Sequence, residues 1–260
     1  MSDVDAQFAD TSPDEVVVCS CPPKGAAAGK TPKGCEYLDK PATVEAPQSD
    51  FDRIRKPSSL DKGTATTFAF PGSTNAGAAT RYVATVAGRQ IPIVTAAAPA
   101  GKSLPTAQQV AQSLGAVPEK QLDSIHQVVV SPNQNPSDAY WAQQYNTPGF
   151  SSAATGGNNG VTFYPSSSPY GQAFVDSTMI HEGGHTFSQA LWKDPAVQKQ
   201  WTDAIASDGS APSTYADNSP GEDFSESLVM YSLSKGTKCE ATAQARYPAR
   251  YAALDKMFKK

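Results

Sequence analysis

One stretch decides how this chain folds and functions, namely Thr178-Met179-Ile180-His181-Glu182-Gly183-Gly184-His185-Thr186-Phe187. In a helix, its His-Glu-x-x-His pattern places two imidazoles one turn apart on the same face, where both can reach a single metal ion. Neutral imidazoles suit zinc, and a catalytic zinc site needs a third protein ligand and one position left for water. Glu182 is placed to accept a proton from that water as a general base. The pattern therefore predicts a zinc hydrolase site on a helix from about Gly171 to Trp192.

A solvated helix that merely carries two histidines is the plainer interpretation of this stretch. The chain holds three histidines, His126, His181 and His185, and two of them fall within the motif. Their concentration favours a metal site, whereas His126, at the start of an apolar segment, is interpreted as structural. Gly183 and Gly184 each weaken a helix by about 1 kcal/mol relative to alanine. We therefore expect these glycines to allow close packing against another backbone.

The third metal ligand must come from outside this helix. The extended metzincin motif needs glycine at position 188 and histidine at position 191, but the chain has Ser188 and Leu191 there. That class is excluded, which leaves a carboxylate as the third ligand. The best candidate segment is residues 215–227, in which Pro220 and Gly221 precede a predicted helix.

Glu222 and Glu226 lie four residues apart in this segment and would share one helical face. Two carboxylates on a buried face repel each other unless a cation or a hydrogen-bond donor lies between them. A zinc ion with its histidine ligands supplies both, so we assign Glu222 as the third zinc ligand. Glu226 is assigned as the acceptor for the other ring nitrogen of a ligand histidine, which fixes that histidine's tautomer. A solvated acidic helix face is the alternative, and Asp217 and Asp223 are weaker candidate ligands.

The assembled motif resembles the gluzincin metallopeptidases, which implies a zincin-like fold. The residues that carry the resemblance are His181, Glu182, His185 and Glu222. Tyr215, together with Phe224 and Glu226, makes the segment similar to the branch of anthrax lethal factor and Pro-Pro endopeptidase. This resemblance implies that Tyr215 lines the zinc and that its hydroxyl group stabilises the tetrahedral intermediate, a role that suits an O–H donor. The resemblance covers residues 105–258.

Composition limits the classes of partner. The chain has 260 residues, with 21 lysines and arginines against 25 aspartates and glutamates and a formal charge of −4. This balance provides no basic surface, so no nucleic-acid partner is expected. No apolar run approaches the roughly 20 residues that span a bilayer, so no membrane span is expected. The acidic start lacks a secretory signal pattern, which favours secretion without a visible signal peptide or, alternatively, a cytoplasmic location.

Three regions are expected along the chain. Residues 1–60 are rich in proline, alanine and glycine and are predicted to be an extended N-terminal arm. Residues 61–100 are predicted to form short β-strands, and residues 101–260 the metallopeptidase domain. The predicted fold class is α+β, mainly helical with a small mixed sheet. By analogy with bacterial effector and polymorphic-toxin metallopeptidases, a secretion apparatus, a carrier or an immunity protein is the expected partner.

Apolar periodicity and turn residues predict the elements of the domain. The predicted helices cover residues 104–125 with a break at Pro118, 195–207, 221–234 and 241–258. The predicted strands cover residues 126–130 and 161–164, and the polar segments 137–159 and 208–219 are predicted to be loops. Gly101-Lys102-Ser103 lacks the upstream glycine of a phosphate loop, so no nucleotide site is expected.

Four cysteines suggest disulfide bonding. They are Cys19, Cys21, Cys35 and Cys239. Four cysteines permit three pairings, and this layout would allow one bridge from the arm to the end of the domain. A structural metal bound through the Cys-x-Cys pair is the alternative, although no histidine lies nearby. Disulfides would indicate an oxidising destination.

The sequence thus predicts an endopeptidase with Zn²⁺ as its cofactor and a peptide or protein as its substrate. Two alternatives stay open: a zinc-stabilised binding or adaptor module without catalysis, and an amide hydrolase that acts on the cell wall. A fourth protein ligand on the zinc would favour the adaptor.

Overall fold

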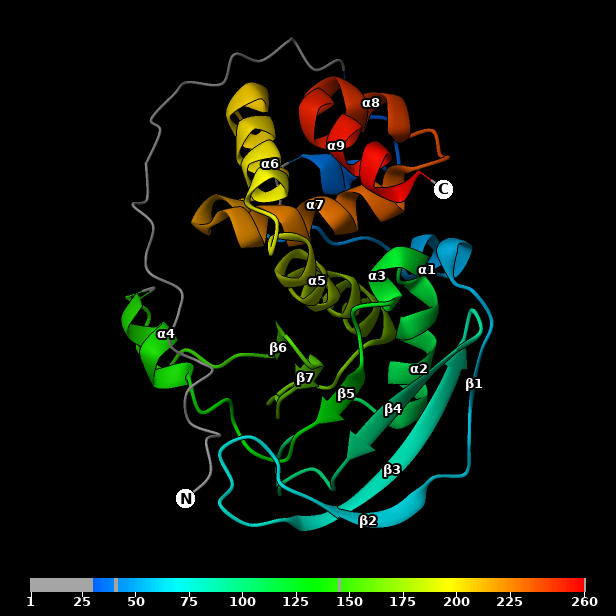
Figure 1. Cartoon of the computed structure of the whole chain (residues 1–260), viewed down its shortest axis with the longest axis vertical. Coiled ribbons are helices and arrows are strands. Elements are labelled where there is room, and N and C mark those ends of the chain that lie inside the picture. Colours follow the sequence, from blue (N-terminus) through cyan, green and yellow to red (C-terminus); the bar gives the residue numbers. More distant parts are fainter. Residues whose placement is uncertain (1–29, 40–41, 145, 260) are drawn as a thin grey trace.

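The computed structural model describes residues 30–39, 42–144 and 146–259 (Figure 1). The protein has the predicted α+β architecture, in which helices are stacked on a mixed sheet of seven strands. The strands are β1 (Ser58–Leu60), β2 (Thr64–Phe68), β3 (Gly77–Val86), β4 (Arg89–Thr95), β5 (Gln127–Val130), β6 (Ala154–Gly157) and β7 (Gly160–Phe163). Their order across the sheet is β1-β3-β4-β5-β7-β6, and β2 also pairs with β3.

The sheet is parallel in its middle and antiparallel at both sides. A tight turn at Ala87 and Gly88, both with positive φ, joins β3 to β4. β4, β5 and β7 are parallel neighbours, and a crossover through α2 (Ala107–Ala116) and α3 (Glu119–Leu122) links β4 to β5. β6 pairs antiparallel with β7 and forms one edge of the sheet.

The helix that carries the motif, α5 (Gln172–Leu191), packs against α2 and the strands β6 and β7, and α7 (Pro220–Ser234) packs against α5 (Figure 1). The remaining helices are α1 (Gln48–Ile54), α4 (Asp138–Gln144), α6 (Pro195–Asp208), α8 (Glu240–Arg246) and α9 (Pro248–Phe258), with 3-10 helices η1 (Glu36–Leu38) and η2 (Ala216–Asn218). Within the described ranges, no helix combines the length and apolar character that crossing a bilayer requires.

Two element predictions are wrong in detail. The helix expected over residues 241–258 is divided into α8 and α9, because Pro248 lacks an N–H group and occupies the first turn of a new helix. The segment 137–159, expected to be a loop, contains α4 and the edge strand β6. The glycines of β6 hide it, since glycine is depleted in strands.

The N-terminal region also differs from the predicted extended arm. Residues 1–29, which include Cys19 and Cys21, lie outside the described residues. From residue 30 onward the chain contains η1, α1 and β1, and Leu38, Val44 and Phe51 are buried in the main hydrophobic core. These apolar residues anchor the segment to the core, but they are widely spaced among prolines and alanines. The sequence pattern therefore did not reveal them as core residues. The β region predicted for residues 61–100 is continuous with the sheet of the domain.

A disulfide joins the two ends of the described chain. Cys35 and Cys239 are bonded, with Cα atoms 5.6 Å apart and a sequence separation of 204. This bridge is the kind that the cysteine layout allowed. It fastens η1 beside the N-terminus of α8.

Replacing both Cys35 and Cys239 by serine is expected to lower the free energy of unfolding by about 2–5 kcal/mol. The reason is that the unfolded chain regains the freedom that a bridge over this separation removes. Urea midpoints of the oxidised wild type and the double variant measure the difference. An unchanged midpoint would show that the bridge adds nothing to stability.

A buried ion network sets the start of α7. Arg250 of α9 is only 1 % exposed, and its guanidinium donates to Asp223 at 2.9 and 2.6 Å and to Asp208 at 3.0 Å. Buried charges are tolerated when they are paired in this way. The network ties α6 and α9 to the first turn of α7, where Glu222 lies.

Candidate metal centre

Close packing between α5 and α7 brings the two halves of the predicted site together. A Cβ atom at Gly184 would lie 3.0 Å from the Cα atom of Ser225 on α7, and one at Gly183 would lie 2.7 Å from Nε2 of Gln121 on α3. An added side chain would press on the α7 backbone at Gly184 and on the buried side chain of Gln121 at Gly183. Gly184 therefore permits the close approach to another backbone that the sequence suggested, whereas Gly183 packs against the side chains of Gln121 and Ile125.

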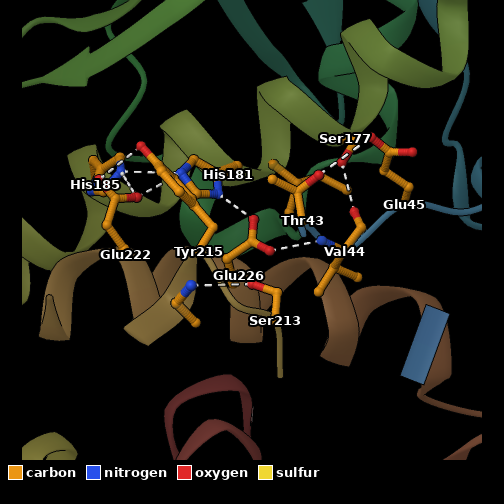
Figure 2. Close-up of polar contacts among 12 residues, drawn as sticks. Thr43, Val44, Glu45, Ser177, His181, His185, Ser213, Tyr215, Glu222 and Glu226 are labelled. Carbon is orange, nitrogen blue, oxygen red and sulfur yellow. Dashed lines mark hydrogen bonds and ion pairs between the residues drawn. The ribbon is translucent and has the colours of Figure 1, made fainter. Parts of the chain in front are cut away.

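The first two turns of α7 present Glu222 and Glu226 to α5. Ser219 caps the helix, because its side chain accepts a hydrogen bond from the Glu222 N–H at 3.2 Å, and Pro220 occupies the first turn. Glu226 follows one turn later on the same face. Cap and spacing together aim both carboxylates at the histidines of α5 (Figure 2).

Three ligand atoms form a small triangle. The Nε2 atom of His181 lies 3.0 Å from Oε2 of Glu222 and 3.2 Å from Nε2 of His185. The third side, from His185 Nε2 to Glu222 Oε2, is 3.2 Å. Zinc bonds of about 2.0–2.1 Å at tetrahedral angles need ligand atoms about 3.3 Å apart. The donor set and its spacing therefore fit a zinc ion.

The hydrogen bond between Glu226 and Nδ1 of His181 decides which ring nitrogen of His181 faces the triangle as an acceptor. Glu226 Oε1 lies 2.8 Å from His181 Nδ1, and an ionised carboxylate can only accept, so Nδ1 carries the proton. The Nε2 atom of a neutral His181 then turns its lone pair toward the Glu222 carboxylate. Two acceptors at this distance need a proton or a cation between them.

The electrostatics of the metal-free site agree with this requirement. Burial opposes a charge on His181, but its hydrogen bonds to Glu222 and Glu226 outweigh burial and raise the pKa of His181 well above the usual range. Burial would raise the pKa of Glu222, yet the charge of His185 and the hydrogen bond from His181 hold that pKa far below the usual range. These shifts favour a proton between His181 and Glu222, at the place that suits a cation.

Zinc binding near pH 7 is expected to release about one proton from the protein. The raised pKa of His181 keeps Nε2 protonated in the metal-free site, and the ion must displace that proton. Zinc affinity should therefore fall as the pH is lowered. Calorimetric titrations in buffers of different ionisation enthalpy count the protons. Proton uptake on binding would exclude His181 as a ligand in this tautomer.

Glu182 lies beside the triangle and against the edge strand. A Cβ atom at Gly156 of β6 would lie only 2.0 Å from the Glu182 carbonyl oxygen, so glycine is required where this strand meets α5. Burial raises the pKa of the Glu182 carboxyl group, although the charges of His181 and His185 lower it. A carboxylate whose pKa is raised toward the working pH is suited to general-base chemistry.

Tyr215 reaches the site from the loop before α7. Its hydroxyl group donates to Glu222 Oε1 at 3.4 Å, and its ring centroid lies 5.8 Å from that of His181. The following turn is held by Ser213, whose hydroxyl oxygen accepts from the Ala216 N–H at 3.1 Å. The structure therefore brings His181, His185, Tyr215, Glu222 and Glu226 of the predicted site into one cluster (Figure 2).

The weaker candidates lie elsewhere. Asp217 is exposed, and Asp223 is paired with Arg250. His126 is exposed as well. Within the described ranges, the one group of residues able to hold a metal ion is His181, His185 and Glu222.

Two contributors to the site were missed in the sequence. Gly156 lies in a segment that was expected to be a loop, and Val44 lies in the supposed arm. The Val44 N–H donates to Glu226 Oε2 at 2.7 Å. A backbone donor leaves no mark in the residue pattern, so the role of Val44 had no readable signal.

A scan against protein-family models found no match, and no curated protein matches the sequence.

Proposed function

We propose that the protein is a zinc-dependent endopeptidase of gluzincin type with a zincin-like domain. The observation that carries this proposal is the triangle of His181, His185 and Glu222 ligand atoms, with sides of 3.0 to 3.2 Å. Two imidazoles and one carboxylate are a common ligand set of catalytic zinc. The group has no fourth member among the described residues, which favours catalysis over a structural zinc in an adaptor module.

The side chains around the triangle have complementary roles in this proposal. Bound zinc would polarise a substrate carbonyl group and lower the pKa of water. Glu182 accepts the proton of the attacking water and passes it to the leaving amine. Tyr215 donates its O–H to the oxygen on which negative charge develops. Glu226 keeps His181 in the tautomer whose Nε2 is free to bind the ion.

The edge strand supports a peptide as the substrate. Among the strands of the described residues, β6 pairs with β7 alone, and Gly156 places it directly against the Glu182 backbone. An extended peptide can add itself to such an edge through backbone hydrogen bonds. A peptide bound there would run beside the residue that we assign as general base. This placement favours peptide bonds over the amide bonds of a cell-wall polymer.

Incubation of the zinc-loaded protein with a peptide library, with cleavage sites identified by mass spectrometry, tests the proposal. We expect cleavage at internal peptide bonds that stops when a chelator removes zinc and returns when zinc is restored. A parallel incubation with purified peptidoglycan tests the cell-wall alternative. Cleavage of peptidoglycan alone, or of neither substrate, would overturn the endopeptidase proposal.

The proposed setting is that of a secreted effector. The Cys35–Cys239 bridge supports an oxidising destination. A secretion apparatus, a carrier or an immunity protein is the proposed partner. Recovery of the protein from culture medium, with this bridge intact by mass spectrometry, is the expected result. Retention of the protein in the cytoplasm with reduced cysteines would contradict it.

A further inference from the structure

A segment before α1 lies beside the metal centre, on the side of Glu226. We call residues 42–46 the strap. The strap begins beside the Tyr215 loop, since the Ala42 carbonyl accepts from the Tyr215 N–H at 3.0 Å. It then passes between α5 and α7, where the Ser177 hydroxyl on α5 donates to the Val44 carbonyl at 3.1 Å (Figure 2). Val44 is 1 % exposed, so the strap buries this residue between the two helices, whereas Ala42 and Glu45 are exposed.

The strap provides a hydrogen bond to the carboxylate that orients His181. Val44 N–H donates to Glu226 Oε2 at 2.7 Å, and Glu226 Oε1 lies 2.8 Å from His181 Nδ1. Glu226 is 2 % exposed, which means that water cannot replace a lost donor without a rearrangement. Within the described part of the chain, each oxygen of this buried carboxylate has one hydrogen-bond partner, and one of the two partners belongs to the strap.

Both ends of the strap are anchored to the body of the protein. On the N-terminal side, Asp39 forms an ion pair with Arg246 at 2.9 Å, and Cys35 forms the disulfide. On the C-terminal side, Arg55 forms an ion pair with Asp176, a buried residue of α5. These anchors hold the Val44 peptide group in place. The Val44 N–H is thus already in position to donate to Glu226 before a metal ion binds.

We propose that the strap is a positioning element of the metal centre, in which the Val44 N–H fixes the Glu226 carboxylate and, through it, the ring of His181. The inference rests on the proposed zinc site, but it does not require peptide hydrolysis. Partners of ligand histidines outside the first coordination shell change metal affinity by about 10- to 100-fold when lost. An effect of that size is expected from losing one backbone N–H that lies far from the motif in sequence.

Val44→Pro removes the donor, and Thr43→Pro is its matched control, because the Thr43 N–H has no acceptor among the described residues. Zinc affinity is measured by competition with a chromophoric chelator, and Co²⁺ absorption spectra report the geometry of the site. We expect Val44→Pro to bind zinc about 10-fold or more weakly, with an altered Co²⁺ spectrum. Thr43→Pro should bind zinc as the wild type does. Equal losses in both proline variants would overturn the inference, since they would indicate general damage.

A second variant tests the same contact if Val44→Pro does not fold. Glu226→Gln keeps an oxygen for His181 but turns its NH₂ group toward the Val44 N–H, so two donors face each other. We expect a loss of zinc affinity of about 10-fold. Where Val44→Pro does fold, the double variant lacks this clash, so Val44→Pro should add little to the loss caused by Glu226→Gln. Wild-type affinity of Glu226→Gln, or fully additive losses, would contradict the role of the strap. Because all readouts concern metal, a wild type that binds zinc but cleaves no peptide would refute the endopeptidase proposal alone.

Discussion

Glu182→Gln is expected to bind zinc like the wild type and to hydrolyse peptides about 10²- to 10⁴-fold more slowly. Glutamine has the shape of glutamate but cannot accept a proton, and Glu182 is not a member of the ligand triangle. The loss should appear in the rate of bond cleavage and leave the metal content unchanged. Metal analysis and the rate at a site found in the peptide library measure the two quantities.

Glu119→Gln is a matched control for this substitution, because Glu119 is exposed on α3. The control should cleave at the wild-type rate. If Glu182→Gln kept full activity with zinc bound, Glu182 could not be the general base, and the proposed mechanism would fail. If Glu182→Gln lost zinc, the residue would have to be reassigned as a ligand.

The second large effect is expected from Glu222→Ala, which should lose zinc. This substitution removes one of three ligand atoms and leaves two histidines, which hold zinc poorly as a pair. The loss of affinity should exceed the about 10- to 100-fold that a lost hydrogen-bond partner outside the coordination shell causes. Peptide cleavage should disappear with the metal. Metal analysis after dialysis against a weak chelator gives the zinc content.

Asp217→Ala serves as the comparison, since Asp217 is exposed and lies just before α7. It should retain one equivalent of zinc. One equivalent bound to Glu222→Ala would instead make Glu226 or Asp217 the third ligand. Excess zinc that restores cleavage in Glu222→Ala would show that the residue serves affinity and not the reaction.

Local sequence signals predicted much of the site. The helix expected from about Gly171 to Trp192 is α5, with Gly171 and Trp192 as its capping residues. The expected spacing of Glu222 and Glu226 on one face follows from Pro220 and the Ser219 cap of α7. In both helices the chemistry depends on residues four apart, and a helix converts that spacing directly into proximity.

Local sequence patterns do not predict the contacts between distant parts of the chain. Gly156 was expected to belong to a loop, because glycine carries no side chain that would signal a strand. The same lack of a side chain permits the contact with Glu182. The strap acts through a peptide group, which every residue possesses. The pairing of Cys35 with Cys239 was one of several that the cysteine positions allowed.

The disulfide shortens the covalent path on which the metal centre depends. Val44 and Glu226 are 182 residues apart along the backbone, but through the bridge the path runs nine residues from Val44 to Cys35 and thirteen from Cys239 to Glu226. Loop-closure entropy grows with the logarithm of path length, so this shortcut favours their contact by about 2 kcal/mol. When the disulfide is formed, only a short loop has to close to bring Val44 to Glu226. When the cysteines are reduced, the same contact requires closing a loop of 182 residues.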